Sequence, residues 1–261
     1  MVAEPASRGA FLGVAALLFA GAAAATIVSG ASMSAMGEMP MPGGWTMSMA
    51  WMQMPGESWA GAAASFLGMW VDMMAAMMLP SLVSMLRRYR QAVAQTGVTR
   101  LRRLTALAGL GYFFVWTLVG VAVFPLGVAL TTVEMREPAL SRAVPIAAGV
   151  IVVIAGALQF TAWKAHHLAC CRAAPAGALP AEAGAALRHG LRLGRHCASC
   201  CAGLIAILLV IGVMDLRAML IVTAAITLER LAPAGALVAR ATGAVAVAAG
   251  LLLIARAAGV G

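Results

Sequence analysis

The sequence predicts an all-α, polytopic transmembrane helix bundle of about seven spans, with six as the alternative. Hydrophobic residues make up 63% of the 261 residues, charged residues 10%, and the mean hydropathy is +0.95. The apolar residues form runs of about 20, the length needed to cross a hydrocarbon core of ~30 Å. The basic residues, which give a net charge of +9, gather in short segments between these runs, as membrane orientation requires. We therefore expect residues 1–261 to form one integral membrane domain and exclude nucleic acid as a partner.

The first apolar run and the segment after it differ sharply in composition. Residues 10–29 predict either a first helix or a signal sequence, and we favour a helix that stays in the chain, because no clear cleavage motif precedes the next segment. Residues 30–58 are rich in Gly, Pro, Ser, Trp and Met and contain no Lys or Arg, which predicts a loop that could hold a short interfacial turn at Trp45, Trp51 and Trp59. Eight of the 18 methionines lie in this loop: Met33, Met36, Met39, Met41, Met47, Met49, Met52 and Met54.

The rest of the chain predicts six further helices separated by short polar or basic segments. In chain order they cover about 60–86, 104–130, 143–165, 182–213, 218–231 and 235–257. The third of these is expected to run on towards Cys171, and the stretch 182–195 is amphipathic. Six spans result if the helices at 182–213 and 218–231 form a re-entrant pair.

The distribution of Lys and Arg predicts the orientation. With a cytoplasmic N-terminus, 14 of the 18 Lys and Arg residues lie in cytoplasmic segments and four in outer segments. The Met-rich loop at 30–58 is then extracytoplasmic, and the segment 164–201 is cytoplasmic. We expect the protein in a bacterial inner membrane as a multi-pass chain.

Cysteine and histidine are confined to one part of the sequence. All five cysteines and all four histidines lie between His166 and Cys201. On a helix, His196, Cys197, Cys200 and Cys201 fall within an arc of roughly 140°. His166 with Cys170, and His167 with Cys171, are i, i+4 pairs that each present nitrogen and sulfur together.

These residue types favour a soft or borderline metal ion. Thiolate sulfur suits Cu(I) and Zn(II), and two ligand-bearing helix ends on one membrane face could complete a four-ligand site. We predict a transition-metal site, copper before zinc, with candidate ligands His167, Cys171, Cys197, Cys200, Cys201, His166, Cys170 and His196. The loop methionines could bind copper through thioether sulfur or serve as apolar filler on the membrane surface.

A second group of residues could line a path to this site or support its ligands. Met73 and Met77 lie on one stripe of the helix at 60–86, which is compatible either with core packing or with a ligand ladder. Asp72 is a carboxyl within an apolar span and so needs a partner, an ion or water. Lys164 and Glu229 could pair, or Lys164 could snorkel while Glu229 supports a ligating histidine.

Several motifs at fixed spacing carry a resemblance to a known family. They are Trp70-x-x-Met73-x-x-Ala76-Met77-Met78-x-Pro80, Lys164-x-x-His167-Leu168-x-x-Cys171-Arg172, Gly190-x-x-x-Gly194-x-x-Cys197-x-x-Cys200-Cys201, Gly212-Val-Met214-Asp215-x-x-x-Met219 and Glu229-Arg230-Leu231-x-Pro233. The chain resembles a bacterial family of integral membrane proteins predicted to bind metal. That resemblance implies metal binding over about 70–233. The chain departs from the family pattern at five positions. It has His167 where the family usually has Cys, Ser199 where Gly is usual, Ala202 where Trp is usual, Asp215 where Asn is common and Arg230 where Lys is common.

Three functions fit these observations. The first is metal handling at the cytoplasmic ends of the helices at 143–165 and 182–213, in transport or in delivery to a membrane or soluble metal-carrier protein. The second is a membrane thiol–disulfide oxidoreductase that uses Cys197 and Cys200. The third is an accessory membrane subunit with a structural metal site. The first and third of these functions are not enzymatic.

Overall fold

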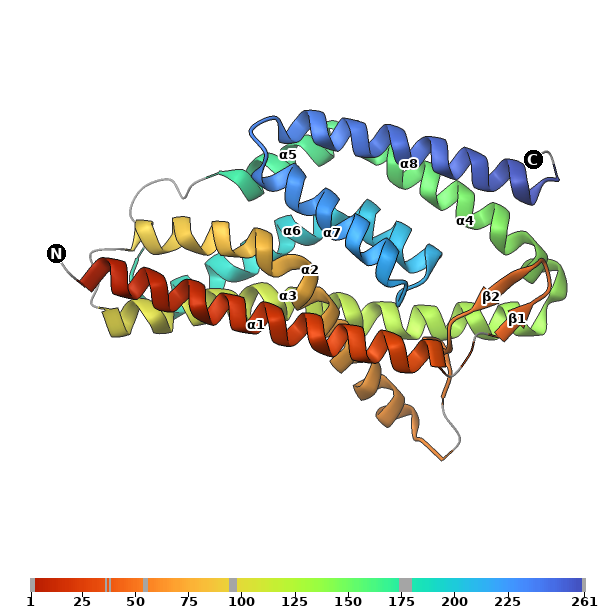
Figure 1. Cartoon of the computed structure of the whole chain (residues 1–261), viewed down its shortest axis with the longest axis horizontal. Helices are drawn as coiled ribbons and strands as arrows, with labels where there is room; N and C mark the ends of the chain where they lie inside the picture. Colours follow the sequence, from red (N-terminus) through yellow and green to blue (C-terminus); the bar gives the residue numbers. More distant parts are fainter. Residues whose placement is uncertain are drawn as a thin grey trace.

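A computed structural model describes residues 3–35, 37, 39–53, 56–93, 98–173 and 180–259. Within these ranges the chain forms eight α-helices, one β-hairpin and one 3-10 turn (Figure 1). In chain order they are α1 (Ala3–Ala35), β1 (Met39–Met41), β2 (Trp45–Met47), η1 (Met49–Trp51), α2 (Trp59–Ala92), α3 (Val98–Arg136), α4 (Pro138–Leu158), α5 (Ala162–Arg172), α6 (Ala183–Ile211), α7 (Leu216–Leu231) and α8 (Gly235–Ala257).

The all-α fold class is confirmed. Among the described helices six are long and apolar enough to cross a membrane, namely α1, α2, α3, α4, α6 and α8, which indicates a multi-pass membrane protein. The helix α7 has 16 residues, fewer than the ~20 that a perpendicular span requires. Even so, Leu220 and Ile221 of α7 are about 70% exposed, so its outer face is apolar. Figure 1 shows α1 beginning and α8 ending at opposite ends of the long axis.

The expected helix over 143–165 is in fact two helices. The first, α4, ends at Leu158, and α5 begins at Ala162. Thr161 lies between them with extended backbone angles, and its hydroxyl accepts a hydrogen bond from the backbone N–H of Lys164 at 3.2 Å. This N-cap starts a new helix, because it satisfies a backbone donor that the first turn leaves without a partner. The break lets α5 pack on α6 and α7 instead of extending α4.

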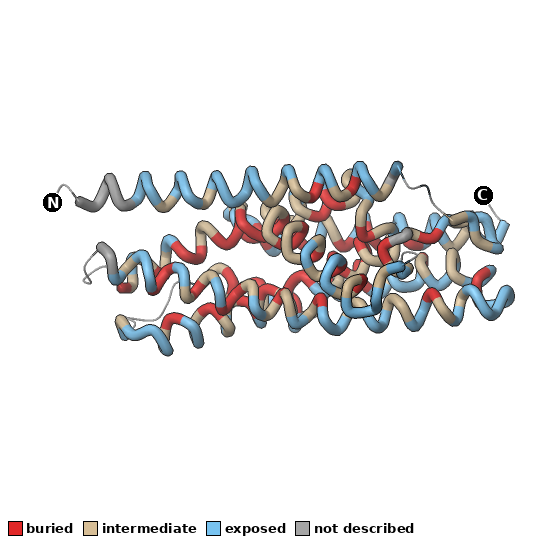
Figure 2. The backbone as a smooth tube through the Cα atoms, turned by 90° about the horizontal axis from the view of Figure 1, so that it is seen from below, coloured by how far each residue is buried: buried red, intermediate tan, exposed pale blue. Residues whose placement is uncertain are grey.

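Close packing through glycine holds the bundle together. The helix α6 lies against α3, α4 and α5, and α4 packs along α8. A Cβ atom on Gly149 would lie 2.9 Å from the carbonyl oxygen of Gly250, so α4 and α8 approach at backbone contact. Such small-residue contacts are the usual way for apolar helices to associate in a membrane. Figure 2 shows the buried residues concentrated in the middle of the bundle, with α1 exposed along most of its length.

The segment expected to be a loop contains a β-hairpin. Strand β1 pairs antiparallel with β2, with Met39 opposite Met47 and Met41 opposite Trp45. Gly43 and Gly44 have φ of 106° and 76°, values that a residue with a Cβ rarely adopts, and they make the turn. The indole of Trp45 donates to the carbonyl of Ser141 at 2.9 Å, which attaches the hairpin to α4. Met36 and Met54 lie outside the described residues.

Candidate metal centre

Four of the five cysteines form one buried group, here called the thiol cluster: Cys171, Cys197, Cys200 and Cys201. They are 2%, 0%, 2% and 0% exposed. Cys197, Cys200 and Cys201 lie on one face of α6, at i, i+3 and i+4, as the sequence predicts. Cys171 comes from α5 and lies within hydrogen-bonding reach of Cys200. That hydrogen bond, together with burial, raises the pKa of the Cys171 thiol. All five cysteines are free thiols.

Polar and sulfur-bearing side chains from three other helices complete the surroundings of the thiol cluster. The guanidinium of Arg230 on α7 donates to Cys197 Sγ at 3.0 Å and to Cys201 Sγ at 2.9 Å. It also donates to the hydroxyl of Ser81 on α2 at 3.0 Å. The phenol oxygen of Tyr112 on α3 lies 2.7 Å from Cys197 Sγ. The thioether sulfur of Met78 on α2 lies 3.9 Å from the same thiol.

These four residues are absent from the ligands that the sequence predicts. Ser81 and Tyr112 are ordinary components of apolar helices, and nothing in their spacing marks them. Met78 belongs to the family motif around Trp70, but that motif does not say that its thioether contacts a thiol. Arg230 does carry a signal, since an arginine inside an apolar helix requires a polar partner in the bundle. The distribution of Lys and Arg predicts a cytoplasmic position for Arg230, but the structure places this residue in the core, where it is 4% exposed.

Lys164 and Glu229 form a buried ion pair next to the thiol cluster. The Lys164 ammonium lies 2.6 Å from Glu229 Oε2, and the two side chains are 3% and 1% exposed. Lys164 also donates to the carbonyl oxygen of Cys200 at 2.8 Å. The pair therefore joins α5, α6 and α7 at the level of the cysteines. Of the two arrangements that the sequence allows, the pair is the one present.

The remaining predicted ligands form a second group, the imidazole cluster: His166, His167, His196 and Cys170. Nδ1 of His167 lies 3.1 Å from Nδ1 of His196, and Nε2 of His166 lies 3.7 Å from Cys170 Sγ. His166 is exposed, and the other three are half-buried. Burial, followed by the neighbouring His166, lowers the pKa of His167, which favours the neutral imidazole that binds metals. The imidazole and thiol clusters adjoin, because Cys170 and His196 directly precede Cys171 and Cys197 on the same two helices.

The predicted path residues on α2 divide between the core and its edge. Met73 and Met77 are 0% and 1% exposed and pack in the apolar core. Met78, one residue further along, is the methionine that reaches a thiol. Asp72 is half-buried, and within the described ranges it has neither an ion pair nor a hydrogen bond.

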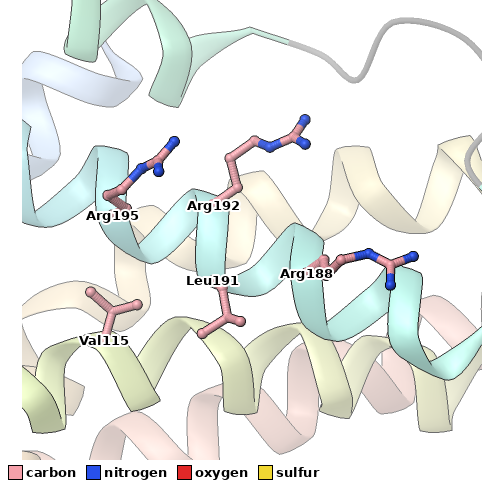
Figure 3. A pocket seen from close by; sticks show the side chains of 5 residues that line it. All are labelled: Val115, Arg188, Leu191, Arg192 and Arg195. Carbon is pink, nitrogen blue, oxygen red and sulfur yellow. The ribbon is translucent and has the colours of Figure 1, made fainter.

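A basic edge precedes the thiol cluster on α6. An open hollow of about 450 Å³ is lined by Val115, Arg188, Leu191, Arg192 and Arg195. Figure 3 shows Leu191 directed towards the helix that carries Val115, with Arg192 and Arg195 directed away from it. This segment is amphipathic, as the sequence predicts, and it continues without a break into the helix that carries the cysteines.

The cysteines and histidines are not arranged as a ready-made tetrahedral site. In the part of the chain that the structure describes, no group of three or more His, Cys, Asp or Glu side chains is placed to hold a metal ion. Two of the thiols, Cys197 and Cys201, share one guanidinium nitrogen of Arg230 as hydrogen-bond donor. Two thiolates are sufficient for Cu(I), which accepts linear coordination, whereas structural Zn(II) usually takes four ligands.

Comparison with known proteins assigns the family. Neither a curated protein nor a solved structure matches the chain. A family model described as PpoB2, a copper chaperone, matches residues 67–253. This region runs from the third turn of α2 to the last turns of α8 and contains both clusters, the ion pair and Arg230. The chain therefore belongs to the PpoB2 copper chaperone family.

Proposed function

We propose that this protein is a multi-pass inner-membrane protein that binds Cu(I) at the thiol cluster and delivers it to a metal-carrier protein. The observation that carries the proposal is the burial of four thiols from α5 and α6 beside a thioether, in a chain of a copper chaperone family. Thiolate and thioether sulfur are the ligands that Cu(I) prefers. Enclosure by apolar helices also keeps water and oxidants away from the ion.

The imidazole cluster supplies an exchange point for the ion. His167 and His196 are half-buried and adjoin the thiols, and His166 and Cys170 are nearer the surface. A chaperone must release its ion to a partner, and ligand-by-ligand transfer needs donors that the partner can reach. The positive-inside distribution of Lys and Arg supports a cytoplasmic position for this cluster and for the N-terminus.

Methionine supplies a second set of soft donors beside the thiol cluster. Met73, Met77 and Met78 on α2 are buried, and Met78 contacts Cys197. The hairpin brings further methionines to the extracytoplasmic end in the proposed orientation. Thioethers bind Cu(I) without deprotonation and cannot form disulfides, so they are usable in an oxidising compartment. Asp72 lies on the same helix and is a candidate for the ion's path.

The two alternative functions have less support. A thiol–disulfide oxidoreductase needs a thiol that a partner can attack, and the thiol cluster is at most 2% exposed. An accessory subunit with a structural metal site would enclose its ion in a full set of ligands, about four for Zn(II), and the described residues do not present such a group.

Metal analysis of the purified protein tests the proposal. The protein is purified in detergent under anaerobic, reducing conditions, loaded with Cu(I), and its copper and zinc are measured by mass spectrometry. We expect one tightly held copper per chain, lost in Cys197→Ser and Cys201→Ser and retained in the matched control Cys170→Ser. Equal copper in wild type and Cys197→Ser would refute the proposal. Copper uptake into vesicles that contain wild type or Cys197→Ser then separates a transport role from a structural one. A structural ion raises the melting temperature of the protein but gives no copper flux across the membrane.

A further inference from the structure

Arg230 is a buried cation that has no carboxylate as a hydrogen-bond or ion-pair partner among the described residues. It is 4% exposed. The nearest carboxylate in the sequence, Glu229, is already paired with Lys164, and that pair is the ion pair found among the described residues. Lys164 and Glu229 together are neutral, so Arg230 adds one uncompensated positive charge to the core. A guanidinium cannot lose its proton in a protein, and an unpaired buried charge is strongly destabilising.

The groups that face the Arg230 guanidinium are mainly sulfur. One nitrogen, Nη2, donates to Cys197 Sγ and to Cys201 Sγ, and Nη1 donates to the Ser81 hydroxyl. The Tyr112 phenol shares Cys197 with it. Nε of Arg230 is buried without a partner. Of the three side chains that accept a hydrogen bond from the guanidinium, only the two thiols can ionise, so Cys197 and Cys201 are the partners able to carry the balancing negative charge.

We propose that Arg230 is the counter-cation of a Cu(I) site made by the thiolates of Cys197 and Cys201, and that it selects monovalent over divalent ions. This inference rests on the proposed function. One Cu⁺ bound by two thiolates carries a charge of −1, and Arg230 brings the buried group to zero. A divalent ion on the same two thiolates is already neutral, so Arg230 leaves an excess positive charge in an apolar core, which is unfavourable.

Loading of the site balances without a redox step. In the absence of metal, one thiolate and one thiol next to Arg230 give a neutral group. Cu⁺ forms bonds to both sulfurs, and the remaining S–H bond breaks to release one proton to the exterior. Copper stays Cu(I), and the charge of the buried group is zero before and after. The ligated sulfurs keep lone pairs that accept the hydrogen bonds from Arg230 and Tyr112.

A pair of probe ions with the same geometry and different charge tests the proposal. Ag⁺ and Hg²⁺ both bind two thiolates linearly, and they differ by one unit of charge. Their affinities for wild type, Arg230→Gln and Arg230→Lys are measured by competition with a small-molecule dithiol in detergent. Glutamine keeps hydrogen-bond donors but no charge, and lysine keeps the charge. Arg172→Gln is the matched control, because Arg172 contacts the carbonyl oxygens of Glu229 and Pro233 and no thiol.

The result is read from the ratio of Ag⁺ affinity to Hg²⁺ affinity. We expect Arg230→Gln to lower this ratio at least tenfold and Arg230→Lys and Arg172→Gln to change it less than threefold. A parallel fall of both affinities in Arg230→Gln means that Arg230 only packs the core, and this overturns the inference. If Arg230→Gln does not fold, wild type decides: its ratio must exceed that of the free dithiol at least tenfold, and an equal ratio overturns the inference. Failure of wild type to bind either Cu⁺ or Ag⁺ refutes the proposed function instead.

Discussion

The buried ion pair of Lys164 and Glu229 makes the fold sensitive to the loss of either partner alone. Replacing Glu229 by leucine leaves the Lys164 ammonium in a core position that is 3% exposed, with the Cys200 carbonyl as its remaining partner. Replacing Lys164 by methionine leaves a buried carboxylate in the same way. In that carboxylate, Oε1 already lacks a hydrogen bond. Each single variant therefore contains one uncompensated buried charge.

The expected loss follows from the 2.6 Å separation and the near-complete burial of both groups. Removing one partner of such a pair typically lowers the free energy of unfolding by about 3–5 kcal/mol. Removing both charges together restores neutrality, and an apolar pair of similar volume is often no less stable than the ion pair. We expect the double variant Lys164→Met/Glu229→Leu to be more stable than either single variant, with an interaction free energy of about 2–3 kcal/mol.

Unfolding in detergent, followed by tryptophan fluorescence, measures these three variants against wild type. Arg256→Met serves as the control, because it removes an exposed charge from the last turn of α8. Its effect should stay within about 0.5 kcal/mol. A double variant that loses as much as the sum of the two singles would show that the charges act independently and would refute the reasoning.

Three further predictions follow from the packing and from the thiols. Gly111→Ala should lower the free energy of unfolding by about 1–3 kcal/mol, because its Cβ would lie 2.6 Å from the Leu187 carbonyl oxygen. Gly109→Ala on the same helix is the control, because a Cβ at Gly109 would meet open space. Equal losses of stability in the two variants on denaturant unfolding would contradict this packing. Trp70→Phe should cost about 1–3 kcal/mol in the same assay, because it leaves the buried Trp116 carbonyl without the 2.9 Å hydrogen bond from the indole; an unchanged midpoint would disprove that role. Alkylation of the folded, reduced protein, followed by mass spectrometry, should label Cys170 quickly and the thiol cluster only after unfolding. Fast labelling that persists in Cys170→Ser would argue against the burial of the thiol cluster.

Local patterns in the sequence were sufficient to predict most helices. The last helix has the bounds that the sequence predicts, 235–257, because Pro233 precedes it and the apolar run stops near Arg256. The break between α4 and α5 was missed, because the apolar composition continues through Phe160 and Ala162. Its signal is a single capping residue, Thr161. The hairpin was also missed, since strands of three residues are too short to show an alternating pattern.

The surroundings of the thiols could not be predicted in the same way. Arg230 is 149 residues from Ser81 and 33 from Cys197, and Tyr112 is 85 from Cys197. Contacts at such separations depend on which helix faces meet, and a hydrophobic period does not specify this. The sequence supplied the ligand-bearing helices, α5 and α6. The side chains that contact the thiols from outside these helices come from α2, α3 and α7, and the charged one among them is Arg230 of α7.

Helix geometry also explains why the predicted ligands divide into two groups. Consecutive residues on a helix point about 100° apart, so neighbours in sequence face different surroundings. His196 therefore lies at the edge of the bundle while Cys197 is in the core, and Cys170 and Cys171 divide in the same way on α5. Each helix thus presents one donor to the interior and its neighbour to the exterior. In the proposed function, Cu(I) would therefore pass between neighbouring residues of each helix, from the sulfur that faces the interior to the donor that faces outward.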